Sequence, residues 1–338
     1  MLSPKEPPLT DRFGRIHTDL RVSLTDRCSL RCDYCMPAEG LPWLPRGDLL
    51  TTQELVRLVA VAVGLGVEQV RLTGGEPLLR PDVVEVVRAI RELPGAPEVS
   101  LTTNGLRLPG LAAKLADAGL ERVNISLDTL DRDTFTRLTR RDRLIDTLAG
   151  IAAAKAAGLS PVKINTVLMP GVNDHEAPAL LRWALAEGLR LRFIEQMPLD
   201  AQHGWRRSQM VTAEQILDRL RAAAFDLRPM GGRGTAPSED WIVAGTNGEP
   251  IGTVGIVGSV TRPFCAACDR VRLTADGQWR NCLFAHDETD LRSLLRDGAA
   301  DAEVAAAIRA SVAGKRRGHG VDAPGFAQPD RPMSAIGG

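Results

Sequence analysis

The sequence is poor in aromatic residues and carries no net charge. Its 338 residues include 42 basic and 42 acidic side chains, aromatic residues make up 4%, and there is one tyrosine. A nucleic-acid-binding protein is expected to be basic and to place aromatic residues among its cations, so both absences argue against that class. The hydrophobic share of 44% and the charged share of 25% are those of an ordinary globular protein.

Long apolar runs and a secretion signal are also missing. The longest apolar run, residues 58–67, is about half of the roughly 20 residues that a helix needs to cross a bilayer. Residues 1–15 lack the basic-then-apolar order of a secretion signal. We therefore expect a cytoplasmic protein without a membrane partner, in which cysteines serve as metal ligands or buried thiols rather than disulfides.

Residues 18–197 repeat one theme, a short β-branched run followed by a turn and a stretch with helical apolar spacing. We expect strands at 20–25, 69–73, 98–103, 122–128, 162–168 and 189–197. We expect helices at 52–64, 81–92, 108–118, 143–157 and 174–187. This α/β alternation predicts a parallel sheet and favours an incomplete (β/α)6 TIM-like barrel, with its chemistry on the loops after the strands. A doubly wound sheet is the alternative.

The composition changes after residue 228. A Gly/Pro-rich loop follows, and residues 241–260 predict a β-hairpin around an Asn-Gly turn. We place a domain boundary here, with 1–228 forming the partial barrel and 229–338 a C-terminal extension. The tail, residues 314–338, shows little helical or strand pattern, and we interpret its basic segment 314–320 as a solvated loop.

The six cysteines fall into two groups of three. Cys28, Cys32 and Cys35 directly follow the first predicted strand, and no histidine lies within ten residues of them. Structural zinc needs four nitrogen or sulfur ligands. An iron–sulfur cluster held by three thiolates, with one iron open to another ligand, therefore explains this group better than zinc or buried thiols do.

Cys265, Cys268 and Cys282 form the second group. His286 lies four residues beyond Cys282, so a zinc site of three cysteines and one histidine is an alternative here. A second iron–sulfur cluster explains both groups by one chemistry, and we favour that interpretation.

The first group, in C-x3-C-x2-C spacing with Tyr34 before its last cysteine, resembles the signature motif of the radical S-adenosylmethionine (SAM) superfamily. The resemblance implies a [4Fe–4S] cluster whose open iron chelates SAM and whose electron releases a 5′-deoxyadenosyl radical. The glycine turn at 73–77, with Gly75, resembles the superfamily's SAM-amino motif. Ser126 and Met197 match further SAM-contact positions. The alternatives are an ordinary glycine turn and strand-end packing.

Motifs spread over residues 12–338 together resemble the GTP 3′,8-cyclase family within this superfamily. They occupy residues 20–37, 71–80, 100–105, 122–128, 193–198, 265–284 and 337–338. The resemblance implies a lyase that converts GTP to 3′,8-cyclo-7,8-dihydro-GTP in the first step of molybdenum cofactor (molybdopterin) biosynthesis. The 5′-deoxyadenosyl radical would abstract the ribose C3′ hydrogen, and the carbon radical would add to C8 of guanine.

The same resemblance implies two [4Fe–4S] clusters, the second of which binds the guanine base, and a set of GTP contacts. By position these contacts are Arg21, Arg71, Thr102, Lys163, Arg270, Val271 and Arg272. Guanidinium groups suit phosphate oxygens, and strand alternation puts Arg270 and Arg272 on one face beside Cys268. Each arginine taken alone is more commonly a solvated charge. The terminal Gly337 and Gly338 would enter the active site and be needed for activity; a frayed end is the alternative.

The implied partners are GTP, an external one-electron reductant and a downstream cyclic pyranopterin monophosphate synthase, and a homodimer is suggested by analogy. Two other functions compete with this interpretation. One is a peptide-modifying radical SAM enzyme with an auxiliary cluster, which would lack the phosphate-facing cations and the diglycine end. The other is a zinc-stabilised, arginine-rich nucleic-acid-binding protein, which the zero net charge disfavours.

Overall fold

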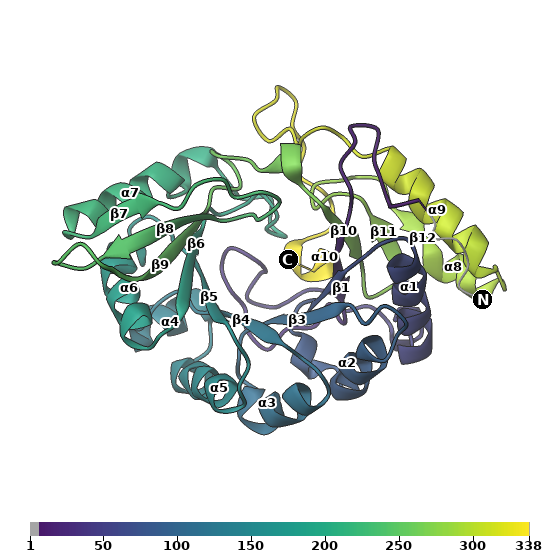
Figure 1. Ribbon diagram of the computed structural model, residues 1–338, viewed down its shortest axis with the longest axis horizontal. Helices are drawn as coiled ribbons and strands as arrows, with labels where there is room; N and C mark the ends of the chain where they lie inside the picture. Colours follow the sequence, from purple (N-terminus) through teal and green to yellow (C-terminus); the bar gives the residue numbers. More distant parts are fainter. Residues whose placement is uncertain (1–6, 338) are drawn as a thin grey trace.

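The computed structural model describes residues 7–337, and one twelve-stranded sheet forms its centre. The sheet curves into an open arc with helices along its outer side (Figure 1). The strands are β1 (Asp19–Ser23), β2 (Gln69–Thr73), β3 (Glu98–Thr103), β4 (Arg122–Ser126), β5 (Val162–Val167), β6 (Arg190–Ile194), β7 (Asp226–Pro229), β8 (Glu239–Ala244), β9 (Pro250–Val257), β10 (Arg270–Leu273), β11 (Gln278–Arg280) and β12 (Thr289–Asp290). The α-helices are α1 (Thr52–Gly64), α2 (Val83–Arg91), α3 (Leu108–Asp117), α4 (Arg132–Thr139), α5 (Leu144–Ala156), α6 (Ala177–Ala186), α7 (Ala213–Ala222), α8 (Leu291–Arg296), α9 (Asp301–Ala313) and α10 (Met333–Ile336).

The middle of the sheet is parallel and follows the order β10-β1-β2-β3-β4-β5-β6-β9. The uninterrupted order from β1 to β6 confirms the predicted partial barrel. It excludes the doubly wound alternative, in which the strand order reverses at a switch point. Two strands from the C-terminal region, β9 and β10, extend the barrel at its two edges, so the sheet continues across residue 228. The domain boundary proposed there stays a prediction.

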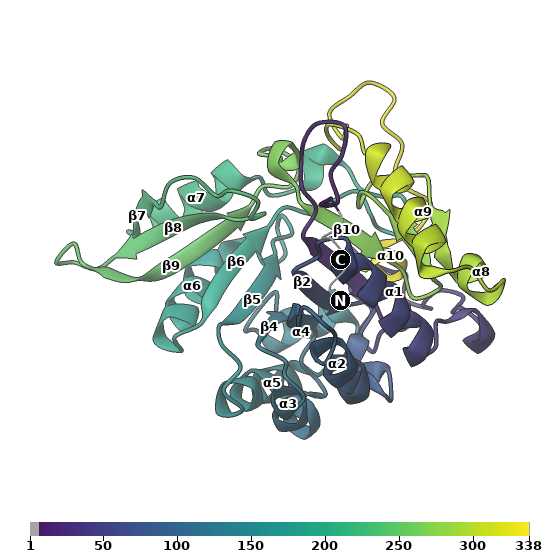
Figure 2. The same cartoon turned by 45° about the vertical axis from the view of Figure 1, so that its right-hand side comes forward.

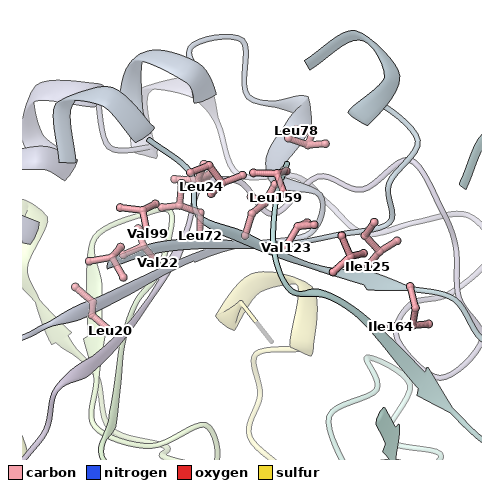
Figure 3. Close-up of a cluster of buried hydrophobic side chains, with 14 of the residues drawn as sticks. Leu20, Val22, Leu24, Leu72, Leu78, Val99, Val123, Ile125, Leu159 and Ile164 are labelled. Carbon is pink, nitrogen blue, oxygen red and sulfur yellow. The ribbon is translucent and has the colours of Figure 1, made fainter. Parts of the chain in front are cut away.

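The core lies between the parallel strands and the outer helices (Figure 3). Alternate side chains of each strand point outward into it, among them Leu20 and Val22 of β1 and Val123 and Ile125 of β4, all of which are fully buried. Burying an aliphatic side chain of this size stabilises the fold by about 1.5–3 kcal/mol. The inward side chains of the same strands are mostly polar, which places the chemistry inside the arc.

Several helices begin at capping residues. Thr51 Oγ1 accepts from the backbone N–H of Glu54 at 3.2 Å, and Glu54 Oε2 accepts from the N–H of Thr51 at 2.8 Å, which closes a capping box at α1. Asp131 caps α4 by accepting from the N–H of Thr134 at 2.8 Å. Such a cap is worth about 1 kcal/mol. It explains why α4 forms in an arginine-rich segment where the apolar pattern is weak.

The structure differs from the sequence predictions at several element ends. β4 and β6 end at Ser126 and Ile194, short of the predicted 128 and 197, because the residues beyond turn toward a cavity. The predicted helix 174–187 starts with a 3-10 turn over Asp174–Glu176 before α6. The predicted hairpin is confirmed as β8 and β9. Within residues 7–337, no helix combines the length and hydropathy that a bilayer crossing requires.

Candidate active site

A cavity of about 210 Å³ opens at the carboxyl ends of the parallel strands. It brings together the first cysteine group and all four residues predicted to contact SAM, together with one predicted GTP contact. Those lining residues are Cys28, Cys32, Cys35, Tyr34, Gly75, Ser126, Met197 and Thr102. They come from loops after β1, β2 and β6 and from strands β3 and β4, as expected for a barrel whose chemistry lies at this end.

The loop that carries the first cysteine group is held from two sides. The backbone N–H groups of Cys35 and Met36 both donate to the carbonyl of Cys32, at 2.9 and 3.0 Å, which closes a tight turn. The N–H groups of Arg31 and Asp33 donate to carbonyls at the end of α4, at 2.9 and 3.0 Å. The unpredicted helix α4 therefore positions the cysteines.

The three thiols of this group are free and half-buried, and all three line the cavity. Burial, reinforced by neighbouring negative groups, raises the pKa of Cys28 to about 11 and that of Cys35 to about 12. Burial raises the pKa of Cys32 as well. Metal ligation requires the thiolate form, so a cationic cluster would stabilise what the protein alone disfavours. Three converging thiols beside an open cavity fit a [4Fe–4S] cluster with room for SAM.

The glycine turn after β2 is required by the cysteine loop itself. Gly74 has φ +140°, and a Cβ there would lie 2.4 Å from the carbonyl oxygen of Thr25. A Cβ on Gly75 would lie 2.3 Å from the carbonyl oxygen of Arg27. The N–H of Gly75 donates to Thr25 at 2.7 Å. These contacts place the glycine turn against the backbone that leads into the cysteines.

Two buried carboxylates missed in the sequence also line the cavity. Glu76 accepts from Thr103 Oγ1 at 2.6 Å and from the N–H of Asn104 at 2.7 Å, tying the loops after β2 and β3 together. Asp128 accepts from Tyr34 Oη at 2.7 Å, and burial raises the pKa of Asp128 to about 6. Both carboxylates sit in the motifs at 71–80 and 122–128, directly after strands, and that position was the signal available for them.

Cations line the inner face of the sheet beyond this cavity. The strand register pairs Arg21 with Arg71 on one side and with Arg272 on the other, so three buried guanidinium groups lie in one row. Burial and the neighbouring Arg21 lower the pKa of Arg272 to about 9. Asp19 compensates part of this positive charge, because each of its carboxylate oxygens accepts a hydrogen bond from Arg21 at 3.0 Å.

Lys163 extends the cation row across β5. Burial, followed by Arg192 and Arg122, lowers the pKa of Lys163 to about 7. Arg122, Arg190 and Arg192 were missed in the sequence, although alternation along β4 and β6 gives them the same inward direction. Val271, predicted as a GTP contact, points outward and is fully buried in the core, so only its backbone faces the arc.

The C-terminal tail enters the arc. Helix α10 lies inside the space that the strands surround (Figure 1), beside β10 in the rotated view (Figure 2). Arg272 Nη1 donates to the carbonyl of Gly337. Ser334 lines the cavity with Cys35, and its backbone N–H favours the ionised form of that thiol. Gly337 has φ +82°, and a Cβ there would lie 2.4 Å from Thr73 Oγ1. Gly338 lies outside the described residues.

The second cysteine group lies at the start of β10 and after β11. Cys265, Cys268 and Cys282 are half-buried and free. Burial opposes ionisation of Cys268, but Lys315 and Arg270 lower the pKa of this thiol below its ordinary value. The predicted solvated loop at 314–320 is wrong for Lys315, which is 2% exposed.

The zinc alternative gains no support from this geometry. His286 Nε2 lies 3.2 Å from the carbonyl oxygen of Ala327. In the part of the chain that the structure describes, no group of three or more His, Cys, Asp or Glu side chains could hold a metal ion by itself. A cubane cluster binds each thiolate to a different iron and so tolerates wider spacing than a single ion does. Both cysteine groups therefore fit clusters better than mononuclear sites.

Comparisons with known proteins agree with this geometry. Residues 22–184 match the Radical SAM superfamily, and residues 189–321 match the family described as Molybdenum Cofactor Synthesis C. The chain is 60% identical over 333 residues to a GTP 3′,8-cyclase of Streptomyces coelicolor, covering 98% of this chain and 96% of that one. It is 56% identical to a GTP 3′,8-cyclase of Mycolicibacterium smegmatis, covering 99% and 93%.

Among solved structures, the chain is similar in fold to SuiB of Streptococcus suis bound to S-adenosylmethionine. The TM-score is 0.56 at 13% identity, and the match covers 89% of this chain and 66% of SuiB. At this identity the likeness bears on the fold alone.

Proposed function

This chain belongs to the GTP 3′,8-cyclase family, and on that premise we propose which of its residues carry the reaction. The enzyme is a radical SAM cyclase that converts GTP to 3′,8-cyclo-7,8-dihydro-GTP in molybdenum cofactor biosynthesis, with two [4Fe–4S] clusters and SAM as cofactors. When bound, the first cluster and SAM supply a 5′-deoxyadenosyl radical that abstracts the ribose C3′ hydrogen, and the carbon radical adds to C8 of guanine. The protein's own task is to hold these groups in a near-attack geometry.

The cavity at the carboxyl ends of the strands is the proposed SAM site. Cys28, Cys32 and Cys35 would hold the first cluster, because their thiols converge on this cavity. The SAM contacts proposed beside them are Tyr34, Gly75, Ser126 and Met197. That all seven residues line one cavity is the observation that supports these assignments best.

The cation row is the proposed GTP site. A triphosphate carries several negative charges, and Arg21, Arg71 and Arg272 present buried guanidinium groups that repel one another in the protein alone. Phosphate oxygens would relieve this repulsion through charge-assisted hydrogen bonds. Lys163, Arg270, Thr102 and the backbone of Val271 complete the proposed set. Arg192 and Arg122 join it because they face Lys163.

The second cysteine group, Cys265, Cys268 and Cys282, would hold the second cluster beside this site, where it binds the guanine base. The tail would close the site through Gly337 and Gly338. We further propose that an external one-electron reductant supplies the electron, that a cyclic pyranopterin monophosphate synthase takes the product, and that the protein is a homodimer. These three points are proposed from the family resemblance alone. We retain the proposed division into 1–228 and 229–338.

An anaerobic assay of reconstituted protein with SAM, dithionite and GTP tests the function. We expect about eight iron atoms per chain, since each cubane holds about four. We also expect 5′-deoxyadenosine that depends on GTP, and a product that becomes a pterin after acid treatment. SAM cleavage without a GTP product would contradict the cyclase assignment, and zinc without iron would contradict the radical chemistry as well.

A further inference from the structure

Lys315 is a buried cation that the proposed reaction does not use. It is one of five lysines in the chain and is 2% exposed. Lys315 follows α9. It contacts Cys268 of the second cysteine group, which lies 47 residues earlier in the sequence. Burying an ammonium group is costly unless it is paired and hydrogen-bonded, so the contacts of Lys315 need an explanation.

Each of the three N–H donors of Lys315 has an acceptor. Nζ lies 2.6 Å from the carbonyl oxygen of Arg270, 3.4 Å from Nδ1 of His17 and 3.8 Å from Sγ of Cys268. An ammonium group offers three donors and no acceptor, so this arrangement fits the charged form. Of these three acceptors, the Cys268 sulfur is the one that would be negatively charged as a cluster ligand, and Lys315 lowers the pKa of its thiol.

Asp11 fixes the orientation of the His17 ring. His17 is fully buried, and its Nε2 lies 3.2 Å from Oδ2 of Asp11. If Nε2 donates to this carboxylate, Nδ1 is left as the acceptor that Lys315 requires. Burial and the charge of Lys315 lower the pKa of His17 to about 4, which keeps its ring neutral. Asp11 and His17 therefore aim the ammonium group at Cys268.

We propose that Lys315 is a positioning residue of the second cluster. The ammonium group of Lys315 donates to the Cys268 sulfur and raises the reduction potential of the cluster. Reduction adds one negative charge to the cluster, and a fixed positive charge beside a ligating sulfur stabilises the more negative state. The inference rests on the proposed second cluster. Arg270 also approaches Cys268 Sγ, at 4.0 Å, but it belongs to the proposed GTP set, whereas Lys315 contacts His17, which in turn contacts Asp11.

The test is a redox titration of the reconstituted full-length protein, followed by electron paramagnetic resonance. The signal that changes on adding GTP reports the second cluster, and the signal that changes on adding SAM reports the first. In Lys315→Met we expect the midpoint of the GTP-responsive signal to become more negative while the SAM-responsive midpoint stays. Lys315→Arg, which keeps the charge, should restore a midpoint near that of the unaltered protein.

Arg316→Met is the matched control. Arg316 is the next residue in the chain and its side chain is exposed, so removing its positive charge should move neither midpoint. If Lys315→Met loses its second cluster, Lys315→Gln gives the same test, since it keeps a donor without the charge. A GTP-responsive midpoint that stays unchanged, or becomes more positive, in a fully loaded neutral variant overturns the inference. Absence of any GTP-responsive signal in the unaltered protein would instead count against the proposed function.

Discussion

The sharpest test of the tail is the substitution Gly337→Ala. Gly337 has φ +82°, and the added Cβ would lie 2.4 Å from Thr73 Oγ1 and 3.1 Å from Ser23 Cβ. An alanine at positive φ costs about 1–2 kcal/mol, and an extra carbon in a packed site adds about 1–3 kcal/mol. The sum is about 2–5 kcal/mol. Because about 1.4 kcal/mol is a factor of ten, the equilibrium constant for docking the tail should fall at least about 30-fold.

The consequence is measured as the amount of cyclised product formed per 5′-deoxyadenosine released. We expect Gly337→Ala to lower cyclisation at least tenfold, on the order of the docking loss just derived, while SAM cleavage continues uncoupled and iron content stays constant. Gly325→Ala is the control in the same tail. Gly325 has a similar φ of +78°, but a Cβ there meets nothing within 4 Å, so it carries the backbone cost without the collision.

Two results would refute this reasoning. Full cyclisation by Gly337→Ala would mean that the observed close packing of the tail is not the active arrangement. Equal losses in Gly337→Ala and Gly325→Ala would mean that stiffening of the tail, rather than the contact with Thr73, determines the effect.

Three further predictions concern other parts of the site. The pKa of Lys163 is lowered to about 7, and a triphosphate prefers the ammonium form, so GTP binding should take up a proton and weaken as pH rises above 7. Calorimetry at pH 8 in two buffers measures this uptake, and Lys163→Arg should reduce it; an unchanged uptake would disprove the role. Gly75→Ala places a Cβ 2.3 Å from the carbonyl oxygen of Arg27 and should remove about half of the iron, whereas Gly47→Ala, with nothing within 4 Å, should keep it. His286→Ala should leave the iron count unchanged, and loss of iron would show that His286 helps to hold the second cluster.

The barrel itself could be predicted because its signals are local. The β-branched runs and helical spacing of residues 18–197 gave strands close to β1–β6, and caps such as Thr51 marked helix starts. The pairing of β10 with β1 could not be predicted in the same way. β10 pairs with β1 across about 250 residues, as in Leu20 with Val271, and no local pattern specifies a partner at that distance. Helix α4 was missed because its cap, Asp131, lies within a run of charges.

The candidate site, like the fold, has features that local sequence predicts and features that depend on long-range contacts. Three of the predicted features are properties of short segments: the cysteine spacing, the glycine turn, and the alternation of Arg270 and Arg272. The first cysteine group and the glycine turn both line the cavity. The burial of Lys315 is not such a property. Its segment is polar and glycine-rich, and its partner His17 lies 298 residues away in sequence. From sequence alone, a charged side chain in such a segment is predicted to be solvated, because its hydrogen-bond acceptors come from distant parts of the chain.

The C-terminal tail connects the first cysteine group with the proposed GTP cations, and we infer that it couples SAM cleavage to cyclisation. At one end of α10, Ser334 lines the cavity beside Cys35, and beyond its other end the carbonyl of Gly337 accepts from Arg272. One short helix therefore contacts both the proposed radical-generating cysteines and the proposed GTP cations. Because a four-residue helix transmits a displacement as a nearly rigid unit, a change at Arg272 should also alter the surroundings of Cys35. Loss of cyclisation and uncoupled SAM cleavage are then two results of one disturbance, which is why the Gly337→Ala experiment has to measure both.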